Sequence, residues 1–178
     1  MLKKVVIIGP ESTGKSTLAK ILADHFDCLW VPEFAREYLD NLDRSYGYDD
    51  LLEIAKGQVN LENELTFKSK ELLVCDTDLN VIKVWSKHKY GRVHPWIEEQ
   101  IKIRKYDLYL LTDIDIPWQD DPQREHPDPG MRKYFFDLYQ KILQDSGTPF
   151  CLISGNEQDR KDLAIEIVNK ILLTSERK

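Results

Sequence analysis

The chain has 178 residues, a length that suits one domain with its own core, and we expect residues 1–178 to form a single domain. Its formal net charge is −6 and no run of lysine and arginine interrupts that acidic balance, so long nucleic acid is not an expected partner. No apolar run approaches the ~18 residues of a membrane span, and the N-terminus leads directly into a predicted strand, which favours a cytoplasmic protein. The three cysteines lack C-x-x-C spacing, which argues against a disulfide framework or a zinc site.

Predicted strands and helices alternate along the chain. The apolar, β-branched run KKVVIIG at 3–9 predicts the first strand, and the spacing of apolar residues in 15–26 is typical of an amphipathic helix. Apolar runs predict further strands at 28–31, 71–76, 107–112 and 149–154. Helical periodicity predicts helices at 34–42, about 51–70, 77–89, 95–104, 131–146 and 157–173.

The segment at about 113–131 interrupts this alternation. It carries Pro117, Pro122, Pro127 and Pro129 together with several charges, a composition typical of a mobile loop. About five strands alternating with helices predict an α/β fold of three layers, the P-loop kinase-like type, in which helices cover both faces of a parallel sheet. Ligands of such sheets bind at the carboxyl ends of the strands, so we expect functional residues just after each strand, with the 113–131 segment as a lid.

A phosphate-binding loop follows the first predicted strand. Residues 9–17, GPESTGKST, match the pattern G-x-x-x-x-G-K-[ST], and the predicted strand before them and helix after them are the flanks that this loop requires. Its glycines let successive N–H groups point into one concavity, and the helix N-terminus adds positive charge beneath bound phosphates. Lys15 is expected to reach the β- and γ-phosphates, and Ser16 to ligate Mg²⁺. The residues expected to bind ATP are Gly9, Glu11, Ser12, Thr13, Gly14, Lys15, Ser16 and Thr17.

Two acidic residues stand at the ends of predicted strands. Asp76 follows the apolar run ELLVC, the position of an acid that binds Mg²⁺ directly or through water, although an aspartate here could instead cap the next helix. Glu33 follows the second strand, where a small-molecule kinase needs a base or a hydrogen-bond acceptor beside the attacking hydroxyl. Glu33 has two other interpretations: it caps the helix at 34–42, or it pairs with Arg36 on the next turn.

Cationic and aromatic side chains complete the set of candidates. Arg36 is a candidate for binding the acceptor or a phosphate. Arg124 and Arg132, near the two ends of the lid, are candidates for neutralising the charge of the transferred phosphoryl group, although a loop arginine is usually only solvated. Trp118 either packs on the core as a hinge or stacks on a flat, cationic ring, and the sequence leaves both interpretations open.

The order of several short motifs resembles a known family. They are GPESTGKST at 9–17, EFAREY at 33–38, IAKGQ at 54–58, DTD at 76–78, YGRVHPW at 90–96, IPW at 116–118 and MRKYF at 131–135. Through these motifs nearly the whole chain resembles the ribosylnicotinamide kinase domain of the bacterial NAD-biosynthesis regulator NadR. The loop alone would indicate only a P-loop nucleoside triphosphatase, whereas E-x-x-R-E-Y, D-T-D and G-R-x-H-P in this order are more specific.

The resemblance implies an enzyme that transfers the γ-phosphate of ATP to the 5′-hydroxyl of nicotinamide riboside, with Mg²⁺ as cofactor. It implies that Asp76 and Asp78 lie at the metal and the acceptor ribose. It further implies that Glu33 and Arg36 lie near the acceptor, and that Trp118 contacts the nicotinamide. Two alternatives stay open: a P-loop kinase for another nucleoside or nucleotide, and a non-catalytic ATP-binding sensor. The oligomeric state does not follow from the sequence.

Overall fold

Five parallel strands form the central sheet of the computed structural model, which describes residues 1–175; the last three residues of the predicted domain lie outside the described part. The strands are β1 (Lys3–Ile8), β2 (Leu29–Val31), β3 (Leu72–Asp76), β4 (Leu108–Thr112) and β5 (Phe150–Ile153). They lie in the order β2-β3-β1-β4-β5, and every neighbouring pair is parallel. Ile7 pairs with Asp76, so the carboxyl ends of β1 and β3 meet at one edge of the sheet.

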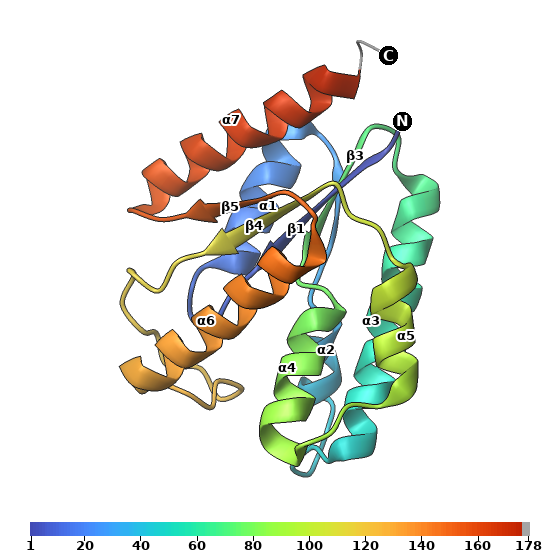
Figure 1. Cartoon of the computed structure of the whole chain (residues 1–178), viewed down its shortest axis with the longest axis vertical. Helices are drawn as coiled ribbons and strands as arrows, with labels where there is room; N and C mark the ends of the chain where they lie inside the picture. The colour runs from blue at the N-terminus through green and yellow to red at the C-terminus, as the bar shows by residue number, and fades with distance from the viewer. Residues whose placement is uncertain (176–178) are drawn as a thin grey trace.

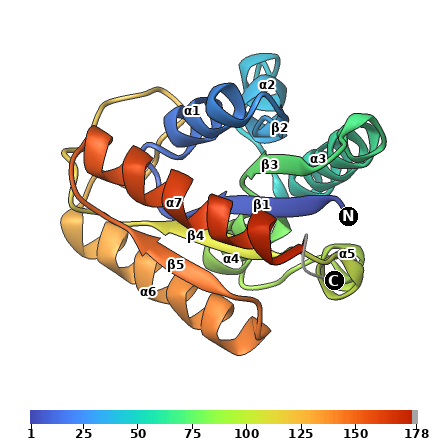
Figure 2. The same cartoon turned by 90° about the horizontal axis from the view of Figure 1, so that it is seen from above.

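Helices cover both faces of this sheet, as the alternation of predicted elements requires (Figure 1, Figure 2). One face carries α1 (Lys15–Phe26) and α7 (Glu157–Ser175). The opposite face carries α3 (Tyr48–Lys68), α4 (Leu79–Tyr90) and α6 (Pro129–Ser146). Two shorter helices, α2 (Phe34–Asp40) and α5 (Pro95–Ile103), pack with α3 and α4 in a third apolar cluster. The predicted three-layer α/β fold is therefore confirmed.

The central strand β1 is buried on both of its faces, which explains its continuous apolar sequence. Val5 and Ile7 pack with residues of α1 and α7, whereas Val6 and Ile8 pack with residues of α4 and α6. This division follows from the period of two in a strand, where successive side chains point to opposite faces. None of the helices within residues 1–175 combines the length and the apolar content needed to cross a membrane. The location of the protein in the cell stays a prediction.

Two helix starts show how local polar groups set the element boundaries. Asp78 is the N-cap of α4 and accepts a hydrogen bond from the backbone N–H of Asn80 at 2.9 Å. Asp128 accepts one from the N–H of Met131 at 2.8 Å, and Pro129 occupies the first turn of α6. Because of this cap, α6 begins before the predicted residue 131, and the lid loop ends at Asp128 rather than at 131.

Candidate functional site

The phosphate-binding loop has a backbone that requires glycine at two positions. Gly9 has a φ of 154°, and a Cβ there would lie 2.3 Å from Oγ1 of Thr112, so no side chain fits. Gly14 has a φ of 78° and is the N-cap residue of α1. The Thr13 hydroxyl is hydrogen-bonded to Thr112 Oγ1 at 2.7 Å, which ties the loop to the end of β4. Short-range and long-range contacts thus hold this loop in one shape at the N-terminus of α1.

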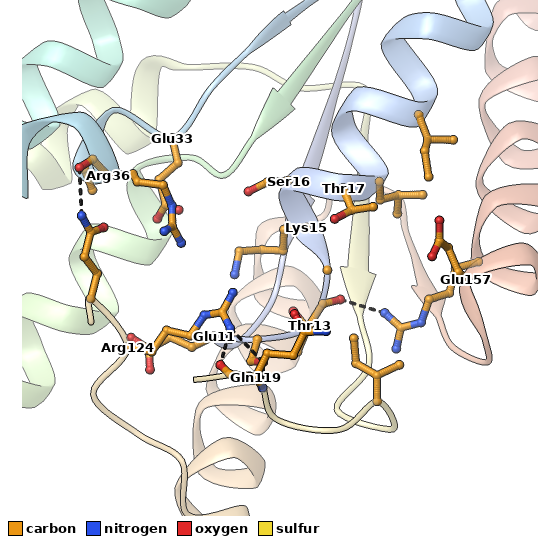
Figure 3. A pocket seen from close by; sticks show the side chains of 18 of the residues that line it. Glu11, Thr13, Lys15, Ser16, Thr17, Glu33, Arg36, Gln119, Arg124 and Glu157 are labelled. Carbon is orange, nitrogen blue, oxygen red and sulfur yellow. Dashed lines mark hydrogen bonds between the residues drawn. The ribbon is translucent and has the colours of Figure 1, made fainter. Parts of the chain in front are cut away.

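A cavity of about 340 Å³ lies over this loop, and Figure 3 shows the side chains around it. Glu33 and Arg36 lie on one side of Lys15 and Glu157 lies on the opposite side. The predicted site residues that line the cavity are Glu11, Ser12, Thr13, Gly14, Lys15, Ser16, Thr17, Glu33, Arg36 and Arg124. The wall also contains residues that the sequence analysis did not select: Leu18, Ile21, Ala35, Leu39, Trp85, Ile116, Gln119, Gln123, Glu157 and Arg160.

Asp76 lies beneath the loop at the end of β3 and is 1% exposed. Burial raises the pKa of Asp76 to about 6, the charge of Glu33 adds to the rise, and the Ser16 hydroxyl and the Lys15 ammonium oppose it. In the described part of the chain, Oδ1 of Asp76 is buried without a hydrogen-bond partner. A buried carboxylate oxygen that lacks a partner beside a serine hydroxyl is suited to a cation. Ser16 and Asp76 therefore fit the Mg²⁺ site that the sequence predicts.

The donor set agrees with a magnesium ion that is held jointly with a nucleotide. Magnesium usually takes one or two carboxylates from the protein, and phosphates and water supply its other ligands. Across residues 1–175 no group of three or more histidine, cysteine, aspartate or glutamate side chains is placed to hold a metal. Lys15 Nζ donates to the Pro10 carbonyl at 2.8 Å, so the ammonium lies against the loop in which phosphates would bind.

Glu33 lies at the cavity with its carboxylate available. It is the N-cap residue of α2, but its side chain makes no capping hydrogen bond. Arg36 forms its ion pair with Asp121 of the lid at 2.8 Å, and not with Glu33. Neither structural interpretation of Glu33 therefore describes its side chain, which has no hydrogen bond or ion pair to any residue of the described chain.

Gln58 of α3 holds the turn on which Glu33 lies. Its Oε1 accepts a hydrogen bond from the N–H of Phe34 at 2.8 Å, and its Nε2 donates to the carbonyl of Pro32 at 3.2 Å. Gln58 is 3% exposed, so these bonds are protected from water. Gln58 is not among the functional residues predicted from the sequence, where its only signal is membership of the IAKGQ motif.

The lid contacts both the phosphate-binding loop and α2. The Glu11 carboxylate accepts hydrogen bonds from the backbone N–H groups of Glu125 and His126, at 3.0 and 3.1 Å. Burial raises the pKa of Glu11, and these two N–H groups oppose the rise. Ser12 Oγ accepts from the N–H of Gln119 at 2.8 Å. Together with the Arg36–Asp121 pair, these contacts hold the lid over the cavity.

The three lid-associated cations have different surroundings. Arg124 lines the cavity and donates to Ser12 Oγ at 3.2 Å. Arg132 is 8% exposed and donates to the carbonyls of Ser12 and Ile116, each at 3.2 Å, and it is absent from the cavity wall. Arg160 of α7 donates to the carbonyl of Thr13 at 2.9 Å and pairs with an aspartate, Asp115. Arg132 and Arg160 thus bind two consecutive carbonyls of the phosphate-binding loop.

Asp78 and Trp118 do not line the cavity. Asp78 is 2% exposed, and its carboxylate accepts from the Asn80 backbone N–H and side chain and from the Tyr109 hydroxyl. The indole N–H of Trp118 donates to Asp120 at 2.9 Å, on the lid itself. The Trp118 ring lies 5.9 Å from the guanidinium groups of Arg124 on the lid and Arg132 on α6. Contact of either residue with a substrate stays a prediction.

Almost the whole chain is similar to known proteins. The NadR proteins of Escherichia coli strain K12 and Salmonella typhimurium strain LT2, both described as trifunctional NAD biosynthesis/regulator proteins, are each 27% identical to this chain over 176 residues. The match covers 96% of this chain and 43% of each NadR protein, so the chain spans less than half the length of these curated relatives. The resemblance to NadR is confirmed.

Solved structures share the fold. A structure of NadR in complex with NR has a TM-score of 0.79 at 23% identity, and one in complex with NAD and AMP-PNP has 0.76 at 22%; each covers 96% of this chain and 49% of the NadR chain. Thymidylate kinase from Ehrlichia chaffeensis has a TM-score of 0.65 at 14% identity, covering 96% of this chain and 98% of that one. Deoxyadenosine kinase from M. mycoides has 0.64 at 13%, covering 94% and 99%.

These likenesses confirm that the fold is that of the P-loop kinases. A family model described as an AAA domain matches residues 4–160, most of the chain, from β1 to the first turn of α7. The matched span contains the loop, the lid and every cavity residue described above. On these grounds the chain belongs to the AAA domain family.

Proposed function

We propose that this chain is an ATP-dependent kinase that phosphorylates nicotinamide riboside on its 5′-hydroxyl to give nicotinamide mononucleotide. The observation that supports it most is that one cavity joins the phosphate-binding loop to Glu33, a carboxylate without a partner in the described chain. A kinase needs these two groups within reach of each other, since the acceptor hydroxyl must meet the γ-phosphorus. The choice of acceptor rests on the likeness to NadR, one structure of which is a complex with NR.

The proposed chemistry assigns a separate task to each side chain. The loop N–H groups and Lys15 bind the phosphates of ATP. Glu33 accepts the proton of the attacking hydroxyl, and Arg124 neutralises charge on the transferred phosphoryl group. Arg36 orients the acceptor from the same side of the cavity as Glu33, and Arg132 acts indirectly by holding the Ser12 carbonyl.

Ser16 and Asp76 are the residues that we propose to hold Mg²⁺. When bound, Mg²⁺ supplies charge neutralisation at the β- and γ-phosphate oxygens. Asp76 suits this role because its Oδ1 is buried without a partner among residues 1–175. Besides ATP and the acceptor we propose no partner, and the net charge of −6 gives no reason to expect nucleic acid.

The test is product formation from ATP and Mg²⁺ with a panel of acceptors: nicotinamide riboside, nicotinic acid riboside, thymidine, uridine and thymidine monophosphate. We expect selective formation of nicotinamide mononucleotide, and its loss in the Lys15→Ala variant, because that ammonium faces the phosphate site. Faster turnover of another acceptor would contradict the choice of nicotinamide riboside and leave a kinase of different specificity. Binding of ATP without turnover of any acceptor would favour the sensor alternative.

A further inference from the structure

Trp85 of α4 is the aromatic side chain in the wall of the cavity described above. It also lines a smaller cavity beside the first, and Glu11, Leu39 and Gln123 are shared by both. Trp85 is partly buried and packs against two apolar clusters of the protein. A hydrogen bond from its indole opposes the rise in the pKa of the buried Tyr139 hydroxyl. The ring is therefore held by its surroundings and forms part of the wall of the cavity that Glu33 also lines.

Carboxylates line the same cavity as Trp85. Glu11 and Glu33 line the cavity, and neither forms an ion pair with a described residue. Four cations of the two cavity walls have other partners. Arg36 pairs with Asp121 at 2.8 Å and Lys89 with Glu125 at 3.1 Å, Lys15 donates to the Pro10 carbonyl, and Arg124 donates to Ser12 Oγ. Two unpaired carboxylates and the face of an indole each attract a positively charged ring.

Trp118, the aromatic residue that the sequence predicts for the site, lies beside cations and not beside carboxylates. Its ring lies 5.9 Å from the guanidinium groups of Arg124 and Arg132. A third cation on this ring would be repelled by both arginines, because like charges at this range interact unfavourably. Of the two interpretations that the sequence leaves open for Trp118, stacking on a cationic ring is thus the less favourable one.

We propose that the flat ring of the acceptor packs on Trp85, and that Glu11 and Glu33 make this position selective for a ring that carries a positive charge. This inference rests on the proposed function, since it names the subsite of the same acceptor. Trp85 acts by contact with the ring, and the two carboxylates act through their charge. Phosphate binding at the loop does not depend on Trp85, which lies on α4 and not on the loop.

The test compares two ligands of the same size that differ in charge. Nicotinamide riboside carries a pyridinium ring, whereas its dihydro form is neutral. Calorimetry in the presence of Mg²⁺ and AMP-PNP measures the affinity of each for the wild-type protein and for Trp85→Leu, Trp85→Phe and Trp118→Leu. Trp30→Leu is the matched control, because Trp30 lies on the edge strand β2 away from both cavities. Thermal unfolding monitors the folding of each variant.

We expect the wild-type protein to bind the cationic form about tenfold more tightly than the dihydro form. Trp85→Leu should lose this preference, whereas Trp85→Phe, which keeps an aromatic face, should retain part of it even if the leucine variant folds poorly. An unchanged preference in a folded Trp85→Leu, or its loss in Trp118→Leu instead, would overturn the assignment of Trp85 alone. A wild-type protein that binds neither form would overturn both this inference and the proposed acceptor.

Discussion

At the scale of single residues, the candidate base Glu33 is available because other residues make the contacts that its side chain could have made. Glu33 keeps its carboxylate available because Arg36 pairs with Asp121 and because the start of α2 is not capped by the Glu33 side chain. Gln58 makes the hydrogen bonds of that turn instead: its side chain accepts from the N–H of Phe34 and donates to the carbonyl of Pro32. These bonds hold the backbone at Glu33 in place, and the Glu33 carboxylate remains available to accept a proton.

Replacing Glu33 with glutamine removes the proposed proton acceptor and keeps the shape of the side chain. We expect kcat to fall by about 10²-fold or more, which is the usual contribution of a positioned base. The melting temperature should change little, since Glu33 has no ion pair or side-chain hydrogen bond within residues 1–175. Glu37→Gln, an exposed change on the same helix, is the control for kinetic assays. An unchanged kcat in Glu33→Gln would rule out the base.

The carboxylate of Asp50 stabilises the folded protein and has no proposed part in catalysis. It is 6% exposed and accepts hydrogen bonds from both Arg44 guanidinium nitrogens, from the Gly47 N–H and from the Tyr38 hydroxyl. The Arg44 and Gly47 contacts hold the pKa of Asp50 well below its usual range. A carboxylate with a lowered folded-state pKa stabilises the fold above its unfolded pKa, and that contribution is lost as the pH falls.

The Asp50→Asn variant should therefore be less stable at neutral pH by about 1–2 kcal/mol, a modest figure because Arg44 is exposed to solvent and screened. The difference from the wild-type protein should shrink as the pH falls through about 4, where unfolded aspartates become protonated. Urea unfolding at neutral and acidic pH measures this difference. Asp49→Asn, on the exposed neighbouring residue, is the control, and a difference that does not depend on pH would contradict the ionic explanation.

At the scale of elements, α2 and α3 pack so closely that one position of α3 has no room for a side chain. A Cβ on Gly57 would lie 2.0 Å from Cε1 and 2.3 Å from Cδ1 of Phe34. Glycine inside a helix usually costs about 1 kcal/mol relative to alanine, so its presence in α3 needs a packing reason. The reason is the ring of Phe34, which directly follows Glu33 on the chain.

Gly57→Ala should therefore destabilise the protein by about 1–3 kcal/mol, despite the better helix propensity of alanine. It should also lower kcat, because displacement of Phe34 moves the adjoining Glu33. A second change, Phe34→Leu, makes room and should recover part of the lost stability, which a double-mutant cycle would show as a coupling energy. A stabilised Gly57→Ala variant would mean that the two helices separate at little cost.

At the scale of the whole molecule, distant parts of the chain hold the phosphate-binding loop. Arg132 comes from α6 and Arg160 from α7, yet they bind the carbonyls of consecutive loop residues, Ser12 and Thr13. Arg160 also binds the carbonyl of Gly155 at 2.8 Å and pairs with Asp115, at the start of the lid. Because the two arginines bind the carbonyl groups of Ser12 and Thr13, the N–H groups of the loop can face a bound phosphate.

We expect Arg160→Lys to raise the KM for ATP by about tenfold, since an ammonium cannot reproduce several hydrogen bonds of the guanidinium fork. The KM for the acceptor should change much less, because Glu33 and Arg36 lie on the other side of the cavity. Steady-state kinetics with each substrate varied in turn separates the two effects. Lys170→Ala, an exposed change on α7, is the control. Equal effects on both KM values would indicate general loosening of the fold.

The sequence alone predicted the order of elements, the three-layer fold and the phosphate-binding loop. These predictions succeeded because they depend on local patterns: apolar runs buried on both faces of the sheet, helical periodicity and a glycine loop between strand and helix. The rule that functional residues follow the strands also placed Glu33 and Asp76 at the same edge of the sheet.

Which of those residues face the cavity depends on contacts between parts of the chain that are far apart in sequence. Asp76 ends β3 and Asp78 follows it, and neither lines the cavity, but the Asp78 carboxylate caps α4 and binds Tyr109, whereas Oδ1 of Asp76 has no hydrogen-bond partner among residues 1–175. Trp85 and Arg160 lie within helices, where periodicity indicates packing and gives no sign of a cavity. Arg160 reaches the loop across 147 positions of sequence, and such a contact has no local signature. Local sequence determines where elements begin and end, whereas the direction of each side chain depends on partners that only folding brings together.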